Sequence, residues 1–315
     1  MMASLPAPEL DSPTGTRHRL EFHRPLDWSP LLTYLDARAT PGMEHVSADG
    51  RYRRTLRLGR FAGWLAISYD PRREGLVLET SATLAPAMAL VLPRIRRLLD
   101  LDLDPRHVSE HLGADAVLGP LVARRPGLRV AGCVDGFELA LRVVLGQQVS
   151  VRGASTLAGR LASRLGEPVT GTKVPELRYL PIQAERLAEA SLGVVRDIGL
   201  PASRAACLIR LAQAVAAGDL PELTLVDTIP DRPVEKPTEF LRRLTALPGI
   251  GPWTATYVAM RGLGWRDAFP EGDLGLRSAM GGASAARMRL LAESWRPWRS
   301  YAAQHLWAGL GDGER

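Results

Sequence analysis

Leu247-Pro248-Gly249-Ile250-Gly251-Pro252-Trp253 is the stretch that decides the fold of the second half of this chain. It separates two segments with helical spacing of apolar residues, Phe240–Leu247 and Trp253–Arg261. The two glycines lack Cβ, so the turn can be tight and can approach another backbone closely. Ile250 can pack against the helices below, and Pro252 fits the first position of a new helix. The stretch therefore predicts a hairpin between two helices.

The start of the second helix points free N–H groups beyond the turn, and an anion is their natural partner. We expect Gly249, Ile250 and Gly251 to contact a DNA phosphate, without reading sequence. An ordinary helical corner that contains glycine is the alternative, but Leu-Pro before the turn and Pro-Trp after it favour DNA contact. A hairpin of this type can also bind an alkali cation through its carbonyl groups.

Asp273 follows the hairpin, in Pro270-Glu271-Gly272-Asp273-Leu274. The plain interpretation is a helix N-cap, and N-capping favours the charged form of the side chain. A fixed carboxylate could also stabilise the positive charge that develops on a sugar when an N-glycosidic bond breaks, and could orient the attacking water. Glu271, two residues earlier, is the alternative carboxylate for this role.

Aromatic residues gather near the C-terminus: five of the seven tryptophans lie in the last 63 residues. Trp253 and Tyr257 are four residues apart and share one helical face beside the hairpin. Such stripes usually belong to a core. Here Trp253, Tyr257 and Trp307 could line a pocket for a flat base, which would attract a cationic base more than a neutral one. The base would have to leave the duplex to reach it.

These motifs together resemble the DNA-3-methyladenine glycosylase II family of the helix-hairpin-helix glycosylase superfamily. The resemblance is carried by Leu247–Tyr257, Asp273 and Trp295–Trp307, and further upstream by Asp27–Ser29, Cys133–Phe137 and Leu145–Ser150. It extends over nearly everything from about residue 20 onward.

The resemblance implies an α+β first domain, similar to half of a TATA-binding fold, and two helical subdomains around a cleft. It implies that Asp273 is the catalytic carboxylate and that Trp253, Tyr257 and Trp307 line the base pocket. Tyr34 falls where the family places another pocket aromatic, and Arg38 on the same helix is expected near the carboxylate.

Two positions depart from the family pattern. Gln148 stands where the family has the residue that fills the hole left by the flipped base, which can be leucine. The polar Gln148 could hydrogen-bond the orphaned partner base. Leu274 follows the aspartate where tyrosine can occur, which removes one aromatic ring and bears on the substrate range.

A lysine is missing where strand cleavage would need it. Superfamily members that also cut the DNA strand place a lysine just after the hairpin glycines, and here Trp253 occupies that position. No lysine follows Lys236, so this part of the chain cannot form a lysine Schiff base. We expect base removal without strand cleavage.

The organisation along the chain predicts two domains after a loose tail at 1–16. Residues 17–112 mix helical segments at Trp28–Ala39 and Pro86–Asp100 with three strand-like runs, Arg51–Leu58, Phe61–Tyr69 and Leu76–Thr83. We expect a small antiparallel sheet with helices packed on it. Residues 113–315 contain short helical segments and no convincing strand after residue 130, which predicts an all-α domain with the helix-hairpin-helix at 238–261.

Charge and cysteine content are consistent with these expectations. Residues 1–115 hold 15 basic and 15 acidic residues, and residues 116–315 hold 25 and 19, so the whole excess of +6 lies in the part that contains the hairpin. Two cysteines cannot supply four thiolates to an iron–sulfur cluster, and they suit a reducing cytoplasm. We expect a cytoplasmic, nucleoid-associated monomer that acts on double-stranded DNA with alkylated bases and needs no cofactor.

Two competing interpretations remain. His107-Val-Ser-Glu-His111 matches a zinc-protease motif, but no third ligand is evident and the predicted helix is brief. The chain could also be a non-catalytic helix-hairpin-helix protein that only binds DNA or senses damage. Asp273 and the aromatic pair Trp253 and Tyr257 distinguish an enzyme from this alternative, because a protein that only binds DNA needs neither.

Overall fold

The computed structural model describes residues 15–169, 172, 174–224 and 237–310. The chain forms two compact units, each built from three separate segments. The first unit combines Met1–Glu21, Leu32–Pro93 and Val144–Gly218, and the second combines Phe22–Leu31, Arg94–Val143 and Asp219–Arg315. The sequence-based division into 17–112 and 113–315 is linear, whereas these units interleave. Of the predicted tail, only Gly15 and Thr16 lie among the described residues.

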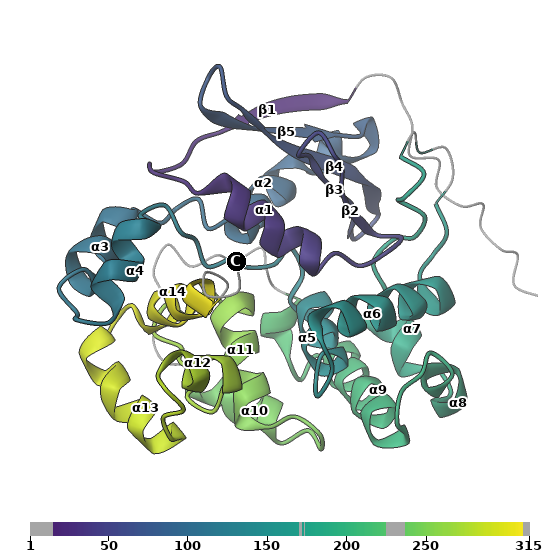
Figure 1. Cartoon of the computed structure of the whole chain (residues 1–315). Coiled ribbons are helices and arrows are strands. Elements are labelled where there is room, and N and C mark those ends of the chain that lie inside the picture. Colours follow the sequence, from purple (N-terminus) through teal and green to yellow (C-terminus); the bar gives the residue numbers. More distant parts are fainter. Residues whose placement is uncertain (1–14, 170–171, 173, 225–236, 311–315) are drawn as a thin grey trace, which may run out of the picture. The chain divides into compact units, whose positions relative to one another are not determined.

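The first unit contains a five-stranded antiparallel sheet (Figure 1). Its spatial order is β1-β5-β4-β3-β2, with bounds β1 Thr16–Leu20, β2 Glu44–Val46, β3 Tyr52–Leu58, β4 Phe61–Asp70 and β5 Gly75–Thr80. The predicted antiparallel sheet is confirmed, and the three predicted strands are β3, β4 and β5. The two edge strands were not predicted, because β1 is Thr-Arg-His-Arg-Leu without an apolar alternation and β2 has only three residues.

Register explains why the central strands form the core of this sheet. Tyr52 pairs with Ile67, and Ile67 pairs with Leu78, so that the three residues lie in line across β3, β4 and β5. All three side chains have no exposed surface. Successive side chains of a strand point to opposite faces, so this apolar row fixes which face is buried.

Helices of the first unit follow the sheet in sequence. They are α6 Val151–Leu165, α7 Ala184–Ala188, α8 Leu192–Arg196 and α9 Ala202–Ala216. Helices α7 and α8 are separate because the Ser191 hydroxyl accepts the Val194 N–H and caps the start of α8. Four further elements lie at or near the points where the chain passes from one unit to the other. They are α1 Trp28–Ala37, η1 Ala82–Ala87, α2 Met88–Leu98 and α5 Gly136–Leu145.

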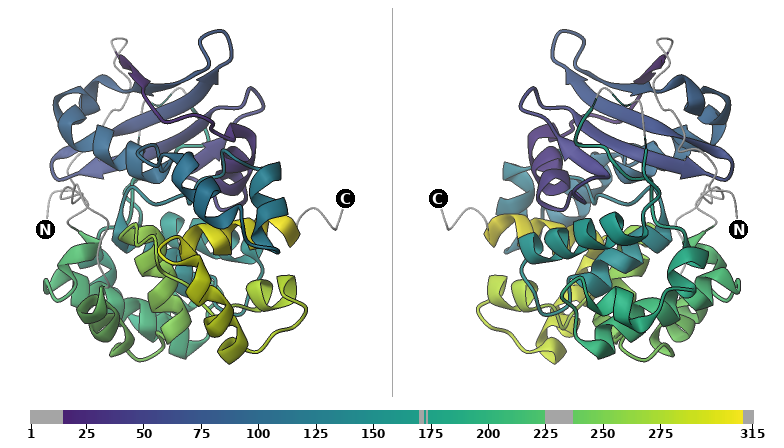
Figure 2. Two further views of the ribbon diagram at one scale, coloured as in Figure 1. Left: turned by 90° about the vertical axis from the view of Figure 1, so that its left-hand side faces the viewer. Right: turned by 90° about the vertical axis from the view of Figure 1, so that its right-hand side faces the viewer.

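The described residues of the second unit form helices and 3₁₀ turns joined by loops, and no strand. Its helices are α3 Pro105–Leu112, α4 Leu118–Arg124, α10 Thr238–Thr245, α11 Pro252–Gly262, α12 Leu274–Ala279, α13 Ala285–Leu291 and α14 Arg299–Leu310, with 3₁₀ turns η2 Pro221–Leu223 and η3 Ala292–Trp295. Helix α14 packs against α4 and α12 (Figure 2). Beyond residue 130 the described residues form isolated bridges but no strand, as predicted.

Within the described ranges, no helix is long and apolar enough to span a bilayer.

Candidate active site

The hairpin connects α10 and α11, which pack against each other. Gly249 has φ +100°, a left-handed conformation that favours glycine, and Ile250 is buried beneath the turn with 5% exposure. The Ile250 N–H donates to the Leu247 carbonyl over 3.0 Å. Pro252 is the first residue of α11, as predicted, and α10 ends at Thr245, two residues before the predicted end.

Gly251 differs from Gly249. It precedes α11 at φ −88°, and a Cβ built on it would meet no atom within 4 Å. Neither the backbone conformation nor a neighbouring atom therefore excludes a side chain at this position. Open space beside the N-terminus of a helix leaves room for a ligand that approaches the backbone, such as a phosphate.

Asp273 is the N-cap of α12, and its carboxylate accepts three N–H hydrogen bonds. Oδ1 accepts from the Leu276 main chain and from Trp307 Nε1, both over 2.9 Å. Oδ2 accepts from Trp253 Nε1, also over 2.9 Å. The side chain is half-buried, and donors from α11, α12 and α14 fix its orientation.

The predicted aromatic residues of the second unit lie together. The Trp253 and Tyr257 rings stack at 5.3 Å between centroids and 21° between planes. Tyr257 and Trp307 are 6.0 Å apart and tilted by 59°. From the sequence, these indoles are expected only as rings of the pocket. Both Nε1–H groups also donate to the carboxylate, and the sequence signal for this is that a half-buried Trp N–H usually has an acceptor.

Gly275 is a second feature that the sequence analysis missed. A Cβ on this residue would lie 3.1 Å from Asp273 Oδ1 and 3.3 Å from Trp307 Cδ1. Both distances are tight for a carbon atom, so glycine lets the α12 backbone approach the hydrogen bond between Asp273 and Trp307. The sequence carries a signal for it, a glycine two residues after the capping aspartate.

The local competitors have other contacts. Glu271 pairs with Arg289, whose Nη2 is 2.8 Å from Oε1. Of the zinc-motif histidines, His107 stacks on Trp298 at 6.4 Å and His111 Nε2 lies 3.2 Å from the Ser294 carbonyl oxygen. The described residues include no group of three His, Cys, Asp or Glu side chains that could bind a metal ion.

Tyr34, Arg38 and Gln148 belong to the first unit. The Arg38 guanidinium lies 4.0 Å from the centroid of the Tyr34 ring. Gln148 is exposed and has φ +57°, which is uncommon for a residue other than glycine. Their participation in the site stays a prediction.

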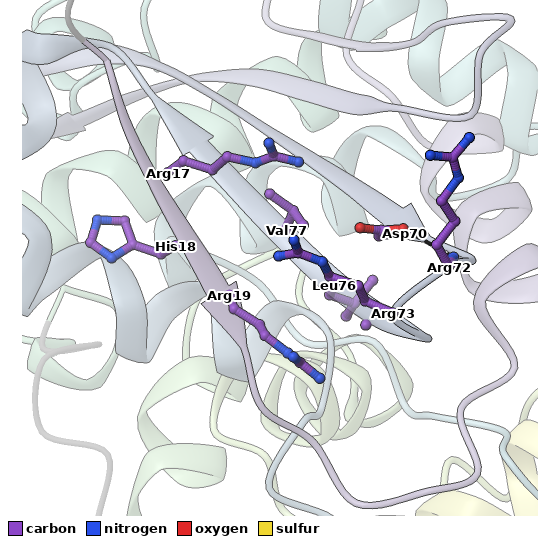
Figure 3. A pocket seen from close by; sticks show the side chains of 9 residues that line it. Arg17, His18, Arg19, Asp70, Arg72, Arg73, Leu76 and Val77 are labelled. Atoms are coloured by element: carbon purple, nitrogen blue, oxygen red, sulfur yellow. Dashed lines mark hydrogen bonds between the residues drawn. The ribbon is translucent and has the colours of Figure 1, made fainter.

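A separate cavity lies on the sheet of the first unit (Figure 3). Arg17 and Arg19 come from β1, and Arg72 and Arg73 from the turn between β4 and β5. Asp70 also lines it, and Arg17 and Arg19 form ion pairs with Glu79 and Glu21. None of the predicted site residues lines this cavity.

Comparisons with known proteins show the family to which the chain belongs. The family model of the AlkA N-terminal domain matches residues 17–135. DNA-3-methyladenine glycosylase 2 of Escherichia coli is 40% identical over 290 residues, which cover 92% of this chain and 96% of that protein. The chain belongs to the DNA-3-methyladenine glycosylase 2 family.

A second relative and a solved structure extend the comparison. A probable bifunctional transcriptional activator/DNA repair enzyme AlkA of Mycobacterium tuberculosis is 42% identical over 298 residues, and the match covers 93% of this chain and 56% of that protein. The fold is similar to 3-methyladenine DNA glycosylase from Archaeoglobus fulgidus, with a TM-score of 0.74, 23% identity, and coverage of 93% of this chain and 97% of that chain.

Proposed function

We propose that this chain is a monofunctional DNA glycosylase that flips alkylated purines, of the 3-methyladenine and 7-methylguanine type, out of double-stranded DNA and hydrolyses the N-glycosidic bond. Membership of the DNA-3-methyladenine glycosylase 2 family supports the reaction class. The observation that carries the proposal is the Asp273 carboxylate, oriented by the N–H groups of the two tryptophans that line the expected base pocket.

The hydrogen bonds suggest which oxygen atom acts. An ionised carboxylate has about four acceptor positions. The N–H groups of Leu276 and Trp307 take two of them on Oδ1, and Trp253 takes one on Oδ2. Oδ2 therefore keeps a position for the sugar or the water. We assign it the stabilisation of positive charge on the sugar and the orientation of the attacking water.

Other residues bind and orient the DNA in this proposal. The Gly249–Gly251 turn binds a phosphate through the start of α11. Trp253, Tyr257 and Trp307 stack on the flipped base, and the first unit contributes Tyr34 and Arg38. Gln148 fills the gap that the base leaves. Its exposure and left-handed backbone at φ +57° support a residue presented at a loop tip.

The remaining proposals concern cofactors, location and assembly. We propose that catalysis needs no cofactor, and that an alkali cation binds the main-chain carbonyls of the hairpin. The protein would act as a monomer in the cytoplasm, associated with the nucleoid. Cys133 and Cys207 are buried and neither forms a disulfide bond, which suits a reducing compartment.

The test replaces the carboxylate by its isosteric amide, Asp273→Asn. Release of 7-methylguanine from a single-lesion duplex should fall by about a thousandfold, because charge stabilisation is lost, while binding to the duplex persists. The matched control is Glu271→Gln, two residues away in an ion pair with Arg289, which should release the base at nearly the wild-type rate.

The same reactions test for strand cleavage. The wild type should leave abasic sites that become nicks only after alkali treatment. Equal release by wild type and Asp273→Asn would remove Asp273 from the reaction, and nicks without alkali would contradict a monofunctional enzyme. A wild type that binds DNA but releases no alkylated base would favour the binding-protein alternative.

A further inference from the structure

Arg261 is a buried cation next to the aromatic residues of the second unit. It lies on α11 one helical turn after Tyr257 and has only 2% of its surface exposed. Its guanidinium donates to the Ala131 carbonyl over 2.7 Å and to Gln304 Oε1 over 2.8 Å. Gln304 is three residues before Trp307 on α14. Arg261 therefore connects the two helices that carry the aromatic residues.

The guanidinium also lies against the rings themselves. Its Cζ is 5.0 Å from the centroid of the Tyr257 ring and 5.9 Å from that of Trp307. These distances are within the range of cation–π contacts. The electron-rich rings that would attract a positively charged base thus already interact with a positive charge of the protein.

This charge has different consequences for charged and neutral bases. When the glycosidic C–N bond breaks, its electron pair goes to the base, which therefore becomes more negative by one unit. A cationic alkylated base leaves as a neutral molecule, whereas a neutral damaged base leaves as an anion. A fixed cation nearby stabilises the anion and opposes binding of the cationic base.

We propose that Arg261 is a specificity-determining residue that, from its position against Tyr257 and Trp307, assists the release of uncharged damaged bases. The inference rests on the proposed function, because it requires the rings to contact the base. The guanidinium is 5.0 Å from the centroid of Tyr257, and stacked rings have centroids about 5 Å apart, so a base stacked on Tyr257 would lie about 10 Å from the guanidinium. At that distance, with an effective dielectric constant of about 20 to 40, one unit charge changes an equilibrium or rate by about four- to fifteenfold.

The experiment compares two lesions in the same duplex, 7-methylguanine as the cationic base and hypoxanthine as the neutral one. Single-turnover rates are measured at increasing enzyme concentration, to give the maximal rate kmax and the half-saturating concentration K½ for each lesion. For Arg261→Gln, kmax/K½ for hypoxanthine should fall about four- to fifteenfold, while that for 7-methylguanine stays within about twofold. The maximal rates for both lesions should fall by a similar factor, because both bases gain the same charge during the step.

Two further variants separate charge from packing. Arg261→Lys keeps the charge and should keep the wild-type ratio of the two kmax/K½ values. Gln304→Glu keeps an acceptor for Arg261 and adds a compensating negative charge, so its ratio should change in the same direction as that of Arg261→Gln. The ratio of two lesions measured on one preparation does not depend on the folded fraction, so partial misfolding cannot imitate the effect.

The outcomes distinguish this inference from the function on which it rests. If the wild type releases 7-methylguanine but no hypoxanthine, or if Arg261→Gln leaves the ratio unchanged, Arg261 has no role in specificity and the proposed function stands. An equal change in the ratio of the two kmax/K½ values for Arg261→Lys and Arg261→Gln would mean that Arg261 acts through its packing and not through its charge. If the wild type releases neither base, the proposed function fails.

Discussion

Trp253 and Trp307 each combine two properties in one side chain. The ring supplies an apolar face and the Nε1–H supplies a donor to Asp273. Replacement by phenylalanine keeps a ring and removes the donor, so it separates the two properties. Because hydrogen bonds to a charged group contribute about 1.5–3 kcal/mol, the orientation of the carboxylate should depend measurably on each donor.

For Trp307→Phe we expect the maximal rate of 7-methylguanine release to fall by about ten- to hundredfold, with K½ changed much less. The matched control is Trp295→Phe, which removes a similar bond: Trp295 Nε1 donates to Asp115 Oδ2 over 2.8 Å. Trp295 is buried, so this control should lower the free energy of unfolding and leave the maximal rate unchanged. If both variants have the same maximal rate, the indole donor does not contribute to catalysis.

Among the secondary-structure elements, the hairpin is the part of the site that the sequence predicts best. Gly249, Ile250 and Pro252 act within one short stretch, so local chemistry dictates their roles. The bonds between Asp273 and the indoles could not be predicted in this way, because they join residues 20 and 34 positions apart in the sequence. Edge strand β1 was missed for a related reason: its pairing with β5 depends on residues about 60 positions away.

The two hairpin glycines allow a test of whether the turn between α10 and α11 binds a phosphate. Gly249 needs a left-handed backbone, so a substitution there would strain the turn. Gly251 does not, so Gly251→Leu should fold normally and block the approach of a phosphate. We expect binding to undamaged duplexes of any sequence to weaken by about tenfold and the slope of log K against log salt to fall by about one.

The control for this variant is Gly193→Leu, an exposed glycine in the first turn of α8 whose Cβ would have similarly open surroundings. Fluorescence anisotropy at several salt concentrations measures both constants. An unchanged salt slope for Gly251→Leu, with weakened binding, would mean that the leucine acts by some means other than the loss of a phosphate contact.

At the scale of the whole molecule, two buried ionisable groups of the second unit act in opposite directions with pH. Burial raises the pKa of Asp100 to about 6, although the Tyr301 hydroxyl donates to it over 2.8 Å. Burial also lowers the pKa of His305 to about 4. In both groups, burial therefore favours the neutral form more than in the unfolded chain.

The sign of each contribution follows from the folded and unfolded pKa values. The Asp100 pKa is higher in the folded state than its ordinary 3.8, so its contribution to stability is lost as pH rises through about 6. The His305 pKa is lower than its ordinary 6.5, so its contribution is lost as pH falls through about 4. Between pH 7 and 5 acidification thus favours folding through Asp100 and opposes it through His305.

Single substitutions should expose this compensation. We compare how the free energy of unfolding changes when the pH falls from 7 to 5. Relative to the change in the wild type, that of Asp100→Asn should be lower by about 1 kcal/mol, and that of His305→Gln should be higher by about 2 kcal/mol. Urea unfolding at the two pH values measures both differences, and each variant's stability at pH 7 corrects for its change in packing. Parallel pH dependence of all three proteins would mean that the pKa values of Asp100 and His305 are nearly the same in the folded and unfolded states.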